Sequence, residues 1–249
     1  MHTVAQITDI HIGLEGEDTY GIDVRRNLAA IFRAIVAHGA DEIVVTGDLC
    51  FSAGAAPVYA WLRSQLEATG LPYRVLPGNH DDPAMLAEAF DLRLRDGALY
   101  DRRDCNGRRE IFLDTSPNRL SETQASFLAE SLAGAEGEAI VWMHHPPLLA
   151  GVRYMDENHP LVDHARVAAI LVAHRAPVHV FVGHYHADVA VSRGAATVYL
   201  APSTFFQIQP LAAGFEVDHR RPGYRLVAFD RDQLRTEVRY LDQGFMLEG

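Results

Sequence analysis

The sequence is poor in cysteine and has no long hydrophobic run. Only Cys50 and Cys105 occur among 249 residues, which excludes a disulfide framework and favours a reducing compartment. No apolar stretch approaches the roughly 18 residues that a membrane-spanning helix requires. Met1 leads directly into a strand-like segment, without the basic region and apolar run of a signal peptide. We therefore expect a soluble, cytoplasmic protein without a membrane partner.

Positive charge is also scarce. The chain has 22 Lys and Arg residues against 33 Asp and Glu residues, which gives a formal net charge of -11. Because an acidic surface repels the phosphate backbone, we do not expect a nucleic-acid polymer as a partner. A small phosphate ester stays compatible, since bound metal ions can create a positive pocket inside a negative protein.

The length and hydrophobic content fit one large domain. Hydrophobic residues make up 48% of the chain, which is enough to fill a sizeable core. The sequence contains no linker, internal repeat or low-complexity tract. We therefore expect a single domain over residues 1–249. The oligomeric state stays open, and a homo-oligomer is allowed.

Short apolar runs alternate with amphipathic segments, a pattern typical of an α/β protein. Strands are expected at His2–Thr8, Glu42–Thr46, Tyr73–Leu76, Arg109–Leu113, Ala139–Met143, Val178–Val182, Ala196–Leu200, Arg225–Phe229 and Leu234–Tyr240. Helices are expected at Asp23–His38, Pro57–Thr69, Ser121–Leu132 and Leu161–His174. Two packed sheets with helices outside would satisfy this order, although the strand order stays open.

Polar residues gather in five short clusters, each directly after a predicted strand. The clusters are Asp9-Ile10-His11, Gly47-Asp48, Gly78-Asn79-His80-Asp81, His144-His145-Pro146 and Gly183-His184-Tyr185-His186. The carboxyl ends of parallel strands converge on one crevice of an α/β sheet. Residues far apart in the sequence are therefore expected to meet at one site.

The spacing within the clusters indicates metal ligands. In extended backbone, residues two apart point to the same face, so Asp9 and His11 can hold one ion together, as can His184 and His186. The candidate ligands are Asp9, His11, Asp48, Asn79, one of the His144-His145 pair, His184 and His186. If Asp48 is shared, these seven residues make two sites of four ligands each. Mixed imidazole and oxygen ligands suit Mn, Fe or Zn better than an all-oxygen magnesium or calcium site.

The charge of such a site favours phosphoester chemistry. Two divalent ions would exceed the negative charge of the carboxylates Asp9 and Asp48, and the surplus would attract a hydroxide and an anionic substrate. This is the arrangement of two-metal phosphoryl transfer. We therefore predict hydrolysis of a phosphate ester by a hydroxide that bridges the two metals.

The five motifs, in this order over residues 9 to 186, resemble the calcineurin-like metallophosphoesterase superfamily. The resemblance implies a four-layer sandwich of two mixed β-sheets flanked by α-helices. It implies one metal site made of Asp9, His11, Asp48 and His186, and a second made of Asp48, Asn79, His144 and His184. It also implies that His80 is the acid for the leaving group, oriented by Asp81.

Several motifs are most similar to bacterial class III cyclic-nucleotide phosphodiesterases and glycerophosphodiesterases. These are His144-His145-Pro146-Pro147, Gly183-His184-Tyr185-His186, Ala201-Pro202-Ser203-Thr204 and Arg221-Pro222-Gly223-Tyr224-Arg225. We therefore expect a phosphodiesterase for a small substrate, such as a cyclic nucleotide or a glycerophosphodiester. The alternatives are a phosphomonoesterase or protein phosphatase on the same site, a metal-free binding scaffold, and a nuclease, which the net charge disfavours.

Other residues are given more ordinary roles. Cys50 is expected to be a small buried hydrophobe, and Cys105 to lie on an exposed loop. The arginines at 102–103 and 108–109 could bind phosphate, but a solvated turn is the favoured expectation. The segment Tyr154-Met155-Asp156 either lines the substrate pocket or forms a plain loop.

Overall fold

The structure is a computed structural model that describes residues 1–105, 107–230 and 233–242. Its first sheet contains β1 (His2–Ile7), β2 (Glu42–Thr46), β3 (Tyr73–Leu76), β12 (Gly223–Asp230) and β13 (Gln233–Tyr240). The strand order is β13-β12-β1-β2-β3, with β1, β2 and β3 parallel and β12 antiparallel to β1. The C-terminal strands thus extend the N-terminal sheet, a pairing that local sequence patterns do not show.

The second sheet follows the same plan. It contains β4 (Asp101–Cys105), β5 (Arg108–Phe112), β6 (Ala139–Trp142), β7 (Val178–Val182), β8 (Ala190–Arg193) and β9 (Ala196–Leu200), in the order β4-β5-β6-β7-β9-β8. The four central strands are parallel, and an antiparallel strand closes each edge. Both sheets are therefore mixed.

Alternation along the strands separates two hydrophobic cores. One core joins the sheets and consists of Val4, Val44, Leu76, Phe112, Ile140, Trp142, Phe181, Val227 and Phe229. Residues in between, such as Ile43, Val45 and Val141, belong to the larger core. Since neighbouring residues of a strand point to opposite faces, each central strand is buried on both sides.

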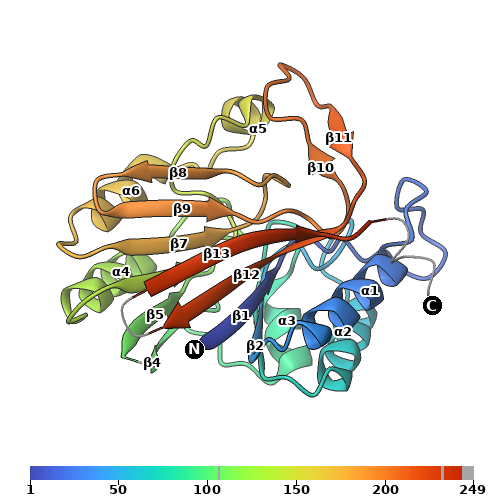
Figure 1. Ribbon diagram of the computed structural model, residues 1–249, viewed down its shortest axis with the longest axis horizontal. Coiled ribbons are helices and arrows are strands. Elements are labelled where there is room, and N and C mark those ends of the chain that lie inside the picture. Colours follow the sequence, from blue (N-terminus) through green and yellow to red (C-terminus); the bar gives the residue numbers. More distant parts are fainter. Residues whose placement is uncertain (106, 231–232, 243–249) are drawn as a thin grey trace.

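Helices cover the outer faces of both sheets (Figure 1). On one side lie α1 (Val24–Ala37), α2 (Ala56–Ala68) and α3 (Pro83–Phe90), and on the other lie α4 (Glu122–Ala133) and α6 (His164–Val172). The Asp23 and Ser121 side chains accept hydrogen bonds from the first turns of α1 and α4, as N-cap residues do. The predicted four-layer sandwich is confirmed.

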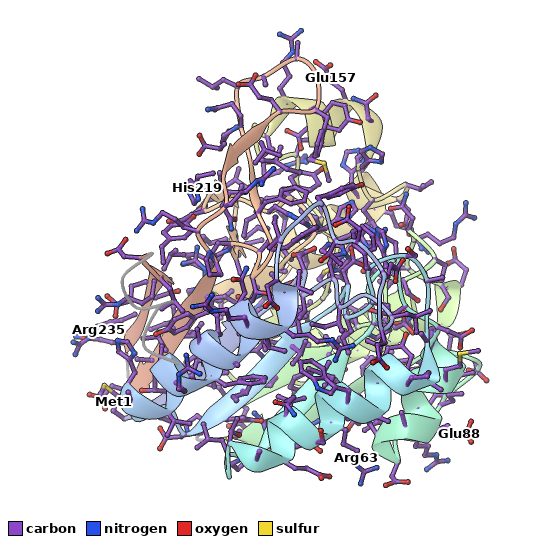
Figure 2. The ribbon with its side chains drawn as sticks, turned by 90° about the vertical axis from the view of Figure 1, so that its right-hand side faces the viewer. Met1, Arg63, Glu88, Glu157, His219 and Arg235 are labelled. Atoms are coloured by element: carbon purple, nitrogen blue, oxygen red, sulfur yellow. The ribbon has the colours of Figure 1, made fainter. Side chains whose placement is uncertain are left out.

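Two small elements stand apart from the layers. The short helix α5 (Arg153–Asn158) and the hairpin β10 (Gln207–Ile208) with β11 (Val217–His219) lie together at one end of the molecule (Figure 2). The amide of Arg153 donates to the carbonyl of Pro210 at 2.8 Å and ties the two together. We refer to α5 and this hairpin as the cap.

The predicted solvated turn of arginines is wrong. Arg103 lies in β4 and forms ion pairs with Glu42 at 2.6 Å and with Glu110 at 2.9 Å. Cys105 ends β4 and is half-buried, so the expected exposed loop is wrong for this residue. Cys50 is buried, as expected. Glu42 is distant in the sequence and lies in the other sheet, so the sequence pattern of this segment does not reveal the ion pair.

Candidate metal centre

The five clusters meet at one end of the sandwich, where strands of both sheets terminate. Asp9 and His11 follow β1, Asp48 follows β2, and Asn79 with His80 follows β3. The second sheet contributes His144 after β6, and His184 with His186 after β7. Short distances described below join residues of the two sheets, so the site lies across their junction.

The backbone at five candidate ligands is left-handed. The φ angle is 51° at Asp9, 51° at His11, 53° at Asp48, 67° at His184 and 46° at His186. A non-glycine residue in this region costs roughly 1–2 kcal/mol. The members of the pairs Asp9/His11 and His184/His186 therefore come together because each adopts a turn-like backbone. The prediction that extended backbone points both members of a pair to one face is wrong. Such strain is characteristic of functional sites.

Two glycines of the motifs leave room for the carboxylates. A Cβ atom on Gly78 would lie 2.3 Å from the amide nitrogen of Asp48, and its side-chain oxygen would be closer still. A Cβ atom on Gly183 would overlap Thr8 and lie 2.6 Å from Oδ2 of Asp9. Only glycine allows these backbones to approach the acidic residues so closely.

The first group of candidate ligands is Asp9, His11 and His186. Nε2 of His186 lies 3.3 Å from Oδ1 of Asp9 and 3.2 Å from Nε2 of His11. All three side chains are buried. The carboxylate of Asp9 also accepts the amide of His184 at 2.9 Å, which fixes its orientation.

The second group surrounds Asp48. Nε2 of His144 lies 3.4 Å from Oδ2 of Asp48 and 3.2 Å from Oδ1 of Asn79. The same Asp48 oxygen lies 3.8 Å from Nε2 of His11 in the first group. Asp48 therefore stands between the two groups, as a bridging ligand would.

Backbone carbonyls hold the histidine rings from behind. Nδ1 of His144 donates to the carbonyl of Thr46 at 2.8 Å, and Nδ1 of His186 donates to the carbonyl of Phe206 at 2.9 Å. Each bond fixes the ring and leaves Nε2 facing the site. Metal-ligating histidines typically have such an outer partner.

His184 is held in the opposite way. Its Nε2 donates to the carbonyl of His159 at 3.0 Å, so Nδ1 is the nitrogen left for a metal. His159 ends α5, and the cap is therefore linked directly to a candidate ligand. No sequence motif reveals this contact, because it is made by a main-chain oxygen.

This arrangement fits metal cations. Nε2 of His186 and Oδ1 of Asp9 face each other at 3.3 Å, and both atoms have lone pairs that a cation between them could accept. Burial lowers the pKa of His11 to about 3, and burial with the charge of His144 does the same for His184. Both rings are therefore neutral near pH 7 and can donate a lone pair.

Without metal, a proton can take part of this role. Burial alone would lower the pKa of His144, but the Asp48 carboxylate outweighs it and raises the pKa to about 9. Burial likewise raises the pKa of Asp9, yet the charge of His186 prevails and lowers it to about 2. The carboxylates thus stay ionised and attract positive charge to the site.

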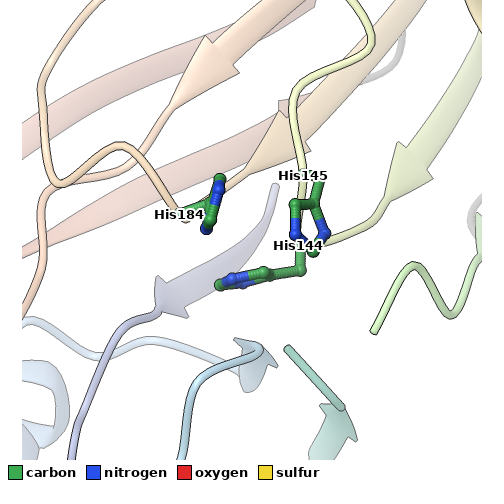
Figure 3. Close-up of side chains that lie close together, drawn as sticks. All are labelled: His144, His145 and His184. Carbon is green, nitrogen blue, oxygen red and sulfur yellow. The ribbon is translucent and has the colours of Figure 1, made fainter. Parts of the chain in front are cut away.

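The adjacent histidines His144 and His145 diverge (Figure 3). Whereas His144 faces Asp48 and Asn79, Nδ1 of His145 lies 2.9 Å from the Thr115 hydroxyl. The His145 ring packs 4.2 Å from the His184 ring between centroids, and burial places its pKa well below the usual value. His145 therefore lies behind the candidate ligands.

His80 and Asp81 occupy different surroundings. His80 borders the site, with Nε2 3.9 Å from Oδ2 of Asp48, while its amide donates to Oδ1 of that residue at 2.9 Å. Asp81 turns away and accepts hydrogen bonds from the amides of Leu49, Cys50 and Gly78. The predicted contact between Asp81 and the His80 ring is not the one that the structure contains. Asp81 instead joins the loops that present Asp48 and Asn79.

A pocket of about 680 Å³ opens above the candidate ligands. Besides ligands and His80, it is lined by Tyr20, Phe51, Ser52, Tyr154, Met155, His159, Phe205, Phe206, Ile208 and Phe215. Tyr154 and Met155 therefore line the pocket, which is the first of the two alternatives given for this segment; the other was a plain loop. The phenylalanines carry no motif; the signal that could have drawn attention is the pair Phe205-Phe206 directly after Ala201-Pro202-Ser203-Thr204.

The late motif Arg221–Arg225 lies elsewhere. Arg225 is buried in β12 and pairs with Asp188 at 2.8 Å, and the Tyr224 hydroxyl lies 2.8 Å from Nδ1 of His38. Neither residue lines the pocket. Arg225 and Tyr224 therefore connect β12, a strand of the first sheet (Figure 1), to Asp188 and to His38.

The architecture and the cluster of buried Asp and His residues define a metallophosphoesterase-like protein. The sequence model of the calcineurin-like phosphoesterase family matches residues 2–188, and the chain belongs to that family. It is therefore a hydrolase that acts on phosphoesters. Its described His and Asp clusters provide groups that can hold metal ions, as this family requires.

Curated relatives cover nearly the whole chain. A Fibrobacter succinogenes protein named a probable cyclic nucleotide phosphodiesterase is 32% identical over 237 residues, 94% of this chain and 92% of the relative. The 3',5'-cyclic adenosine monophosphate phosphodiesterase CpdA of Vibrio vulnificus is 26% identical, covering 97% and 91%. The glycerophosphodiester phosphodiesterase GpdQ of Enterobacter lignolyticus is 28% identical, covering 82% and 78%.

Solved structures agree on the fold. A dimetal phosphatase from Danio rerio superposes with a TM-score of 0.66 at 15% identity, over 94% of this chain and 98% of that one. Purple acid phosphatase PPD1 from yellow lupin gives a TM-score of 0.66 at 16% identity, over 96% and 51%. At these identities the likeness concerns the architecture alone. In the described residues no helix is both long and apolar enough to cross a membrane.

Proposed function

We propose that the protein is a dinuclear-metal phosphodiesterase that hydrolyses a small phosphodiester in the cytoplasm. The observation that carries the proposal is the meeting of seven ligand-type side chains at the strand ends, beneath a pocket that His80 also lines. Relatives named for cyclic nucleotides and for glycerophosphodiesters support the substrate class. Both are small esters in which phosphate carries one negative charge.

Two ions of Mn, Fe or Zn would be held by the two groups of ligands. Asp9, His11, Asp48 and His186 would bind one, and Asp48, Asn79, His144 and His184 the other. When bound, the pair supplies a hydroxide at neutral pH and charge stabilisation of the transition state. The protein contributes the histidine rings fixed by backbone carbonyls and the Asp48 carboxylate between the two groups.

His80 is proposed to protonate the leaving oxygen. Its side chain is 35% exposed and faces the pocket, whereas the other imidazoles at the site are held in place by buried contacts. Nδ1 of His80 has no hydrogen-bond partner in the structure, so no hydrogen bond through this atom fixes the ring. Its amide bond to Asp48 keeps it beside the metal ligands without making it one.

The charge of the pocket favours a diester over a monoester. The chain has no lysine, and no arginine is among the residues that line the pocket. A phosphomonoester dianion would bring a second negative charge that only the metals and His80 could offset. A phosphodiester monoanion has no such requirement. The phosphomonoesterase and protein phosphatase alternative therefore has less support.

The test compares two chromogenic esters on protein of measured metal content. We expect about two metal ions per chain and a higher kcat/KM for bis(p-nitrophenyl) phosphate than for p-nitrophenyl phosphate. A reversed preference would establish the monoesterase alternative. A metal-free protein that stays inactive after Mn, Fe or Zn is added would instead establish a binding scaffold.

A further inference from the structure

Six aromatic side chains form a continuous wall of the pocket. They come from the loop after β1, the loop after β2, the cap and the segment after β9. We call them the aromatic arc: Tyr20, Phe51, Tyr154, Phe205, Phe206 and Phe215. These segments are far apart in the sequence, except that Phe215 lies shortly after Phe205 and Phe206, and no sequence motif connects them.

One limb of the arc begins at a candidate ligand. The Phe205 ring lies 5.4 Å from the His11 ring between centroids. Tyr20 stacks on Phe205 at 5.9 Å with only 10° between the ring planes, and Phe51 meets Phe205 edge to face at 5.9 Å. The rings of this limb therefore extend from the candidate ligand His11 to Tyr20 at the mouth of the pocket.

The other limb begins at a second candidate ligand. Phe206 lies 5.0 Å from the His186 ring, and Phe215 of the cap meets Phe206 at 5.9 Å. Tyr154, also of the cap, lies 5.8 Å from Phe215 and completes the limb. Phe205 and Phe206 are 4.5 Å apart, so the two limbs join directly above the ligands.

The rings differ in exposure in a way that suits binding. Phe205 and Phe206 are 2% and 6% exposed, and they anchor the arc in the core. Tyr20 at the end of one limb is 62% exposed, and Phe215, between Phe206 and Tyr154 in the other limb, is 54% exposed. Large aromatic side chains standing in water at the mouth of a pocket are the kind of surface that marks a ligand-binding groove. Their open faces can be covered by a flat ligand group.

The arc has little else to offer a substrate. Among the described residues that line the pocket, polar groups other than the ligands, His80 and His159 are limited to the hydroxyls of Ser52, Tyr20 and Tyr154. A polyol would therefore exchange water for few hydrogen bonds, and a second phosphate would find no cationic side chain. A planar ring would gain stacking and apolar contact.

We infer that the aromatic arc selects phosphodiesters whose alcohol carries a flat aromatic ring, with Tyr20 and Phe215 as specificity-determining residues. The inference rests on the proposed phosphodiesterase function and narrows its substrate class. Rings can also bind a quaternary ammonium group by cation–π attraction. The parallel stack of Tyr20 on Phe205 continues more naturally into a third flat ring, so the planar group is chosen over the cation.

Three diesters with an alkyl leaving oxygen separate these chemistries. Adenosine 3',5'-cyclic phosphate carries a planar ring, glycerophosphocholine carries a quaternary ammonium, and glycerophosphoglycerol carries neither. Binding of adenosine, which has no phosphate, adds a measurement that is independent of hydrolysis and of metal. A protein that binds adenosine but cleaves none of the three diesters would refute the phosphodiesterase function and keep the arc.

The variants remove the exposed rings and spare the core. Tyr20→Asn is suitable because asparagine tolerates the left-handed backbone at this position, where φ is 53°. Phe215→Leu keeps an apolar side chain in the cap. Val36→Ala is the control, since Val36 is an exposed apolar residue of α1 that does not line the pocket.

We expect each variant at the arc to lose about fivefold to a hundredfold in kcat/KM for the cyclic nucleotide and in affinity for adenosine, the range found when one stacking ring is removed. Activity on glycerophosphoglycerol should change less than twofold, and Val36→Ala should match wild type. Equal losses on all three diesters would overturn the inference, as would a loss confined to glycerophosphocholine. Unchanged adenosine affinity in both variants would overturn it as well.

Discussion

Asp81 offers a sharp test, because its predicted role and its observed contacts lead to different outcomes. If Asp81 oriented the His80 ring, Asp81→Ala would reproduce the catalytic defect of a His80 variant and leave the fold intact. The structure instead places the Asp81 carboxylate among the amides of Leu49, Cys50 and Gly78, at 3.1, 3.2 and 2.8 Å. We therefore expect Asp81→Ala to act mainly on stability.

Four donors lose their acceptor, the three amides and the Tyr59 hydroxyl, which donates to Asp81 at 3.1 Å. Because a hydroxyl can reorient, the magnitude is taken from the three fixed amides. An unsatisfied buried donor costs about 1–3 kcal/mol. Burial and the charge of Asp48 raise the pKa of Asp81 to about 6, which shows that keeping this carboxylate charged has a cost of its own. We therefore take the lower value for each donor, about 3 kcal/mol in total. At about 2–4 °C per kcal/mol for a chain of this size, Tm should fall by about 6–12 °C.

The assay is thermal unfolding of the metal-loaded wild type, Asp81→Ala and a neighbouring control, Asp82→Ala. Asp82 caps α3 by accepting the amides of Ala84 and Met85 at 2.9 Å, and losing an N-cap costs about 1 kcal/mol. Its Tm should therefore fall by about 2–4 °C. If Asp81→Ala unfolded within 2 °C of wild type and lost activity only on esters with poor leaving groups, the structural role would be refuted.

Three further variants test the site. Asp48→Ala should lose both metals and nearly all activity, because Asp48 stands between the two ligand groups; two metals retained per chain would exclude a bridging role. His144→Ala should lower the measured metal content, whereas His145→Ala should retain it, since only the His144 ring faces Asp48 and Asn79; the opposite result would reverse the assignment. His80→Ala should reduce kcat on an alkyl ester by about 10²–10⁴-fold and spare a p-nitrophenyl ester, whose leaving group needs no acid. Equal losses on both esters would leave His80 only a positioning role.

Much of the fold could be predicted because hydrophobic periodicity is strong in the buried parallel strands. The expected strands at Glu42–Thr46 and Val178–Val182 match β2 and β7, and Gly39 follows α1 and its C-cap as expected. The edge elements could not be predicted in the same way. Strand β4 is rich in charge, and its Arg103 is paired with Glu42 and Glu110, which belong to other strands. The helix α3 has only 8 residues and begins two residues after Asp81, and no helix is predicted there from the sequence.

The candidate ligands could be named from the sequence because each follows a predicted strand and each has a side-chain oxygen or imidazole nitrogen that can bind a metal. Their outer partners could not. Thr46, His159 and Phe206 orient the histidine rings through backbone carbonyls, and any residue type can supply a carbonyl. The aromatic arc escaped prediction for a related reason, because it is assembled from loops whose positions depend on the packed sheets.

The left-handed residues show that the candidate ligands are brought together by a local geometry other than the expected one. Extended backbone would have pointed Asp9 and His11 to one side of a strand, but β1 ends at Ile7 and both residues turn at φ near 51°. The same turn recurs at His184 and His186 after β7. Each of these four left-handed residues costs roughly 1–2 kcal/mol, and the packing of the sheets on either side of the junction must offset that cost. The rule that failed assumes that the strand continues through the motif, whereas the strand ends before the motif and the backbone turns at each of these residues.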